Sequence, residues 1–189
     1  MADIVNDFII LKAQEEGNVK VADSLLRAAT IENPTSEFVH LVQMITANQL
    51  AFLIETSPSD ATKVAKNYLQ IVTYPRSGYW NDGDSIYITT LLSSLIAVGA
   101  RTDDRDILVS TLRLIEFMES DVIDSNLALY TSGGYAILEQ KDKMLEWAKR
   151  ARQLGVPPEA FLDLDYSKDY KPTEFIPYKA DPEFLEAIK

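Results

Sequence analysis

The stretch Gly17-Asn-Val-Lys-Val-Ala-Asp-Ser-Leu-Leu-Arg-Ala-Ala-Thr-Ile-Glu-Asn-Pro34 decides the fold class of this chain. Its large apolar and alanine side chains recur at intervals of three and four residues, which is the spacing of a helix with one buried face. A glycine opens the stretch and a proline closes it, and neither residue readily continues a helix. The stretch therefore predicts one helix of a hairpin, bounded by a turn on each side.

The same spacing recurs along most of the chain, and turn residues divide it into about eight helical segments. Strict alternation of polar and apolar residues, the signal of a strand, is nearly absent before the last thirty residues. The turns inside successive hairpins fall near Gly17, Ser57, Arg101 and Gln140, at spacings of 40, 44 and 39 residues. Short connections predict antiparallel neighbours, and this period is typical of helical solenoids. A globule like a four-helix bundle is the alternative.

Single residues predict where several of these helices begin and end. Side chains that can cap a helix precede the expected first turns, and a glycine follows the last long helix. The expected starts are Ser57 with Pro58, Ser85, Asp103 or Asp104, and Asp124 or Ser125, and the expected stop is Gly155.

The stretch from Gly17 to Pro34 resembles the second half of a tetratricopeptide repeat. The matching residues, in order and spacing, are Gly17, Asn18, Ala22, Leu26, Ala29 and Pro34. The last hairpin is similar, with small residues at positions 132–134, an aromatic at Tyr135, and Ala148 and Ala151 on its second helix. The segment from Ala180 to Ile188 is similar to the short closing helix of such arrays.

This resemblance implies an all-α fold, a right-handed superhelix of about four antiparallel helical hairpins of the tetratricopeptide-like solenoid type. Residues 1–162 would form the helical-repeat domain, and residues 163–189 an extended tail with a short C-terminal capping helix. The two middle hairpins match the 34-residue pattern poorly. For residues 35–120, a HEAT-like or irregular helical array is therefore an alternative to the tetratricopeptide-like one.

Composition and charge exclude several classes of function. The 189 residues carry 18 Lys and Arg against 29 Asp and Glu, a net charge of −11, which argues against a nucleic-acid binder. The chain has no cysteine, so disulfides, thiolate metal sites and thiol nucleophiles are excluded. No apolar run approaches the roughly 20 residues of a membrane-spanning helix. A cytoplasmic protein without a cofactor is expected.

Candidate catalytic and metal sites are few. His40, the only histidine, lies in an apolar helical segment and is expected to be a packing or surface residue. Oxygen-bearing side chains alternate from Asp163 to Glu174 as in a calcium loop, but Lys168 occupies the position of the required glycine. The acidic stretch Asn81–Asp84 is better explained as a turn.

Aromatic residues suggest where a partner could bind. The richest cluster surrounds one loop, and its residues are Tyr74, Arg76, Tyr79, Trp80 and Tyr87. Aromatic residues with an arginine are typical of interface hot spots and also of packing between hairpins, and both interpretations stay open. Further aromatics in the tail, including Phe175 and Tyr178, either pack back on the array or bind a partner, and we hypothesise that the tail covers one surface of the array.

The sequence thus predicts a non-catalytic scaffold that binds a protein or peptide. The binding surface would comprise the first helix of each hairpin, forming a concave face, together with the aromatic loop. One alternative is an acidic inhibitor or immunity-type protein that neutralises a basic enzyme. A further alternative is an enzyme or a small-ligand receptor, for which the sequence offers no converging set of polar residues.

Overall fold

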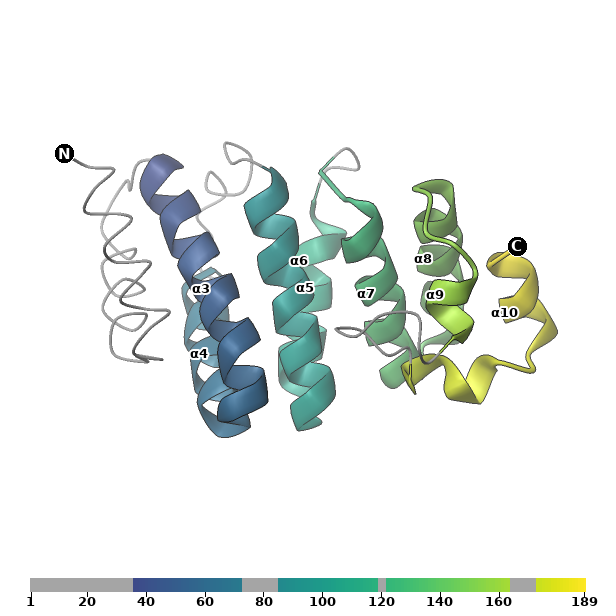
Figure 1. The fold of residues 1–189 in the computed structure, drawn as a ribbon, viewed down its shortest axis with the longest axis horizontal. Helices are drawn as coiled ribbons and strands as arrows, with labels where there is room; N and C mark the ends of the chain where they lie inside the picture. Colours follow the sequence, from purple (N-terminus) through teal and green to yellow (C-terminus); the bar gives the residue numbers. More distant parts are fainter. Residues whose placement is uncertain (1–35, 73–84, 119–121, 164–172) are drawn as a thin grey trace. The chain divides into compact units, whose positions relative to one another are not determined.

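The structure, a computed structural model, describes residues 36–72, 85–118, 122–163 and 173–189. Within these ranges every regular element is a helix and no strand occurs, which confirms the predicted all-α class (Figure 1). The chain divides into two compact units, Met1–Met118 and Glu119–Lys189. The sequence predicted a boundary between the repeat domain and the tail near residue 162. That boundary is a different division of the chain, and it stays a prediction.

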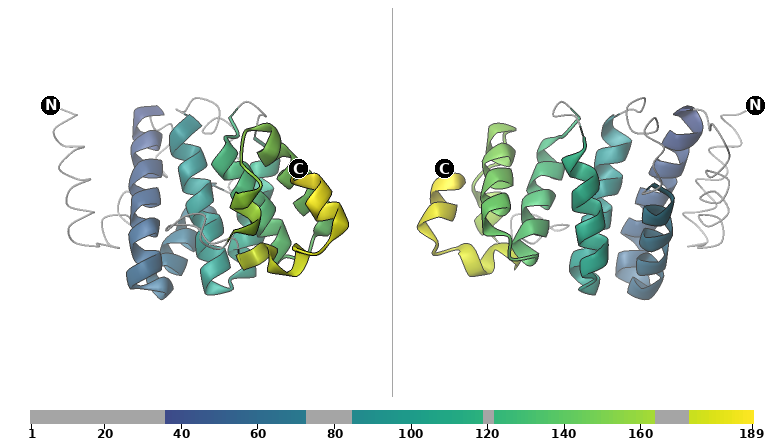
Figure 2. Two further views of the ribbon diagram at one scale, coloured as in Figure 1. Left: turned by 45° about the vertical axis from the view of Figure 1, so that its right-hand side comes forward. Right: turned by 180° about the vertical axis from the view of Figure 1, so that it is seen from behind.

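The described part of the first unit contains two helical hairpins in two layers (Figures 1 and 2). Its helices are α3 (Ser36–Thr56), α4 (Pro58–Val72), α5 (Ser85–Thr102) and α6 (Arg105–Glu116). Helices α3 and α5 lie side by side in one layer, and α4 and α6 form the other. The layers enclose a core of fully buried side chains that includes Leu50, Leu91, Leu92, Leu95, Leu108 and Leu112. Burial of this apolar surface is the main force that holds the hairpins together.

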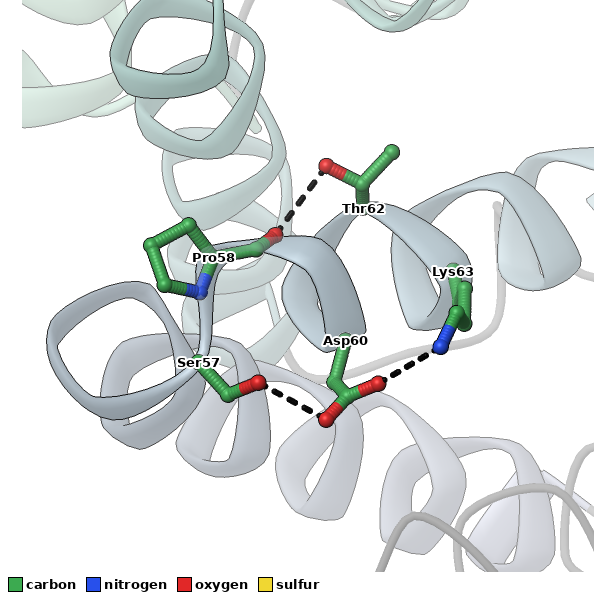
Figure 3. Close-up of polar contacts among 5 residues, drawn as sticks. All are labelled: Ser57, Pro58, Asp60, Thr62 and Lys63. Carbon is green, nitrogen blue, oxygen red and sulfur yellow. Dashed lines mark hydrogen bonds and ion pairs between the residues drawn. The ribbon is translucent and has the colours of Figure 1, made fainter.

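The start of α4 is fixed where the sequence predicts it (Figure 3). Pro58 occupies the first helical position, where its missing N–H costs no hydrogen bond. The Ser57 carbonyl accepts the first helical bonds, from Asp60 N and Ala61 N at 3.0 Å each. The Ser57 hydroxyl donates to Asp60 Oδ2 at 2.7 Å, and Lys63 Nζ lies 2.8 Å from Asp60 Oδ1. Asp60 therefore links the cap residue to the first turn.

The α5–α6 hairpin depends on a close approach of its two helices. A Cβ added to Gly99 would lie 2.8 Å from Leu108 Cγ, so only glycine lets α6 pack this near. Asp104 caps α6, because its side chain accepts a hydrogen bond from Ile107 N at 3.2 Å. This selects Asp104 from the two predicted cap residues.

The described part of the second unit contains one hairpin and a closing segment. The hairpin consists of α7 (Ser125–Ile137) and α8 (Lys141–Gln153), followed by the short α9 (Glu159–Leu162). Asp124 caps α7 through a 2.7 Å bond from Leu127 N, and Gly155 follows α8 with φ of +94°. Both ends confirm the sequence predictions. Ser132 donates to Met144 O at 2.9 Å, so this small residue brings α7 close to α8 as expected.

In the described part of the predicted tail, a short C-terminal helix occurs as expected, whereas residues 173–178 are helical rather than extended. This part forms a 3-10 helix, η1 (Thr173–Tyr178), and α10 (Pro182–Ala187). Phe175 and Phe184 are fully buried and meet Phe161 of α9, with ring centroids 5.4–6.3 Å apart. Three mutually packed rings bury a large apolar area in favourable tilted and stacked geometries. The prediction that the tail covers a surface of the array therefore holds for residues 173–189 within this unit.

Candidate protein-binding face

Most of the residues that the sequence predicted for partner binding lie outside the part of the chain that the structure describes. Tyr74, Arg76, Tyr79 and Trp80 fall in residues 73–84, as does the turn at 81–84. Tyr87 lies in α5 and His40 in α3, but the described side chains include neither. The aromatic-loop site therefore stays a prediction.

Only the first residue and the last residues of the candidate calcium loop, 163 and 173–174, are described, because residues 164–172 are outside the described ranges. Glu174 is the second residue of η1, and the calcium loop itself stays a prediction. Among the described residues, no group of three or more His, Cys, Asp or Glu could hold a metal ion. Over the same residues, no helix is long and apolar enough to cross a membrane.

Helix α3 exposes a stripe that carries almost no charge. The stripe follows helical spacing, and its members are Met44, Asn48, Ala51, Phe52 and Glu55. Phe52 leaves 48% of its surface exposed, although an aromatic ring of this size gains from burial. An exposed aromatic among short neutral side chains is typical of a surface that a partner covers.

Helix α5 exposes a matching stripe of short side chains. Its members, all at least partly exposed, are Thr90, Ser93, Ser94, Ala97, Ala100 and Arg101. Arg101 reaches across to Glu55 of α3 with two guanidinium contacts, the longer of which is Nη2 to Oε2 at 3.4 Å. The two stripes therefore adjoin and form one surface, named here the α3–α5 face.

The electrostatics of the α3–α5 face are neutral. Among the described side chains of the two helices, Glu55 and Arg101 are the only charged ones, and they pair with each other. The pair is exposed, with 62% of the Glu55 side chain and 54% of the Arg101 side chain accessible, so solvent and salt screen it. The described part of the α3–α5 face therefore carries no net charge.

The opposite layer of the same unit is charged. Exposed or partly exposed ionic side chains on α4 and α6 are Asp60, Lys63, Lys66, Arg105, Asp106, Arg113 and Glu116. Lys66 Nζ lies 2.6 Å from Asp104 Oδ2; this hydrogen bond lowers the pKa of Asp104 and raises that of Lys66. The α4–α6 layer thus has the solvated character of an outer surface, in contrast to the α3–α5 face.

Behind the face, a buried polar contact joins the two layers. The side chain of Gln43 on α3 hydrogen-bonds the hydroxyl of Tyr68 on α4, and both residues are buried. Burial raises the pKa of the Tyr68 hydroxyl well above its ordinary 10.0, and the Gln43 bond lowers it less. Tyr68 is thus neutral at physiological pH, and its ring contributes to packing of the first hairpin.

In the second unit, the chain covers the corresponding surface of α7 itself. Aligning the hairpins at Asp104 and Gln140, the N-cap residues of α6 and α8, pairs Ala97 with Gly133 and Ala100 with Ala136. Segment η1 lies on these two α7 positions. A Cβ added to Gly133 would be 2.6 Å from Glu174 Oε1, and the Tyr178 hydroxyl is 3.5 Å from Ala136 O.

Comparison with known proteins gives no further assignment: no family model, no curated protein and no solved structure matches this chain. The inference about function therefore depends on the geometry of the two units.

One sequence signal for the α3–α5 face was available. Residues 38–54 and 85–100 contain no Asp, Glu, Lys or Arg, although charged residues make up 25% of the chain. Such stretches indicate helices that are buried or covered on most sides. The partial exposure of their stripes, and especially of Phe52, becomes visible only in the folded unit.

Proposed function

We propose that this chain is a non-catalytic helical-repeat protein that binds a protein or peptide segment on the α3–α5 face. The observation that carries the proposal is the contrast between the layers of the first unit. The α4–α6 layer is ionic, whereas the α3–α5 face is neutral, has short side chains and exposes Phe52. A surface of this kind gains free energy when a complementary apolar segment removes it from water.

The repeat architecture belongs to the same proposal. Hairpins α3–α4, α5–α6 and α7–α8 follow one another along the chain, and small residues occur at equivalent positions of the first helices of the last two, Ala97 and Gly133. A right-handed superhelix of tetratricopeptide-like hairpins would bring such first helices to one concave surface. A non-catalytic scaffold is the simplest role for that surface.

The acidic-inhibitor alternative predicts a different kind of contact. Recognition of a basic enzyme requires unpaired carboxylates at the interface and is weakened steeply by salt. On the α3–α5 face the one described carboxylate, that of Glu55, is already paired with Arg101. Binding through this face is therefore expected to tolerate salt.

The proposal is tested by capturing partners with the tagged full-length protein from a lysate of its source organism. The capture is done at low and at roughly physiological salt, and bound proteins are identified by mass spectrometry. We expect one stoichiometric partner that is retained at both salt concentrations, because apolar contacts are not screened. A partner that is lost at the higher salt would favour the acidic inhibitor, and no partner at either salt would contradict the proposal.

A further inference from the structure

We draw no further inference here: the strongest candidate, the buried side chain of Gln49 on α3, whose amide has no hydrogen-bond partner among the described residues, carries no proposal because nothing in the structure shows what covers it or which ligand would reach it.

Discussion

Helices α5 and α7 occupy the same place in successive hairpins, yet their outer surfaces differ. On α7, the chain's own η1 covers Gly133 and Ala136, whereas the corresponding Ala97 and Ala100 of α5 remain accessible. Short side chains thus serve two purposes in one molecule. In the second unit they allow η1 to pack on α7, and in the first unit they leave a neutral surface accessible.

The strength of the two arrangements differs as well. The cover of α7 is held by a buried aromatic cluster of Phe161, Phe175 and Phe184, and Lys179 Nζ donates to Leu162 O at 2.5 Å. The α3–α5 face has one half-exposed ring, Phe52, and one screened ion pair. The described contacts on the α3–α5 face are therefore fewer and more exposed than those that hold η1 in the second unit.

The largest expected effect comes from breaking the cover of α7 with Phe175→Ala. Removing a fully buried ring deletes its apolar contacts and leaves a cavity, so the free energy of unfolding should fall by about 3–5 kcal/mol. Urea denaturation measures this change. Ile176→Ala, at a neighbouring side chain that is 51% exposed, is the matched control and should change stability by less than about 1 kcal/mol. A similar small loss for both variants would show that η1 is not a core element.

A smaller effect is expected when alanine replaces each of the two close-packed glycines, Gly99 and Gly133, and the two substitutions should differ in stability. Gly99→Ala forces a Cβ against Leu108 Cγ at 2.8 Å and its backbone N at 3.2 Å, and should cost about 1–3 kcal/mol through overpacking. Gly133→Ala meets the end of the flexible Glu174 side chain, which can turn aside. Alanine also favours a helix by about 1 kcal/mol over glycine, so Gly133→Ala should be nearly neutral. Thermal unfolding of both variants decides this, and the reverse order would refute the packing account.

The smallest expected effect is the loss of stability at acidic pH from the ion pairs that attach α10 to α8. Lys141 Nζ lies 2.6 Å from both Asp181 Oδ2 and Glu183 Oε2, and the Lys141 hydrogen bond lowers the pKa of Asp181 below 3.8. Because the folded-state pKa is depressed, the stabilisation is present above about pH 4 and is lost as the pH falls through the folded value. From pH 5 to 9 this pair should add no pH dependence.

The variant Asp181→Asn isolates this contribution. It should retain the cap on Glu183 N through its amide oxygen but lose the ion pair, so its stability should approach that of the wild type as the pH falls below 4. Melting temperatures measured from pH 3 to 7 test this. A constant difference between the two proteins across that range would rule out Asp181 as the titrating group.

Local signals in the sequence were sufficient to predict that the chain is helical and where several of the helices begin or end. Ser57 with Pro58, Asp104, Asp124 and Gly155 each act within one helical turn, so their roles could be predicted without knowledge of the fold. Helical spacing likewise predicted the all-α class, because it reflects which side of each helix is buried.

Contacts between distant residues could not be predicted in this way. Glu55 and Arg101 are 46 residues apart, and no local pattern indicates that they pair. The small residues at positions 132–134 were noted in the sequence, but not what each would contact: Gly133 faces Glu174 of η1, and Ser132 makes the contact with α8. The exposed ring of Phe52 was also missed, since helical spacing does not distinguish a covered surface from an accessible one.

The central claim is that the α3–α5 face of the first unit binds a partner. Its most direct test compares Phe52→Ala with Phe117→Ala in capture from lysate, because both rings are exposed, at 48% and 88%, but only Phe52 lies on the face. Neither variant should unfold the protein, since neither ring is buried. The account predicts that the partner is lost with Phe52→Ala and retained with Phe117→Ala. Retention with both variants, or loss only with Phe117→Ala, would contradict it.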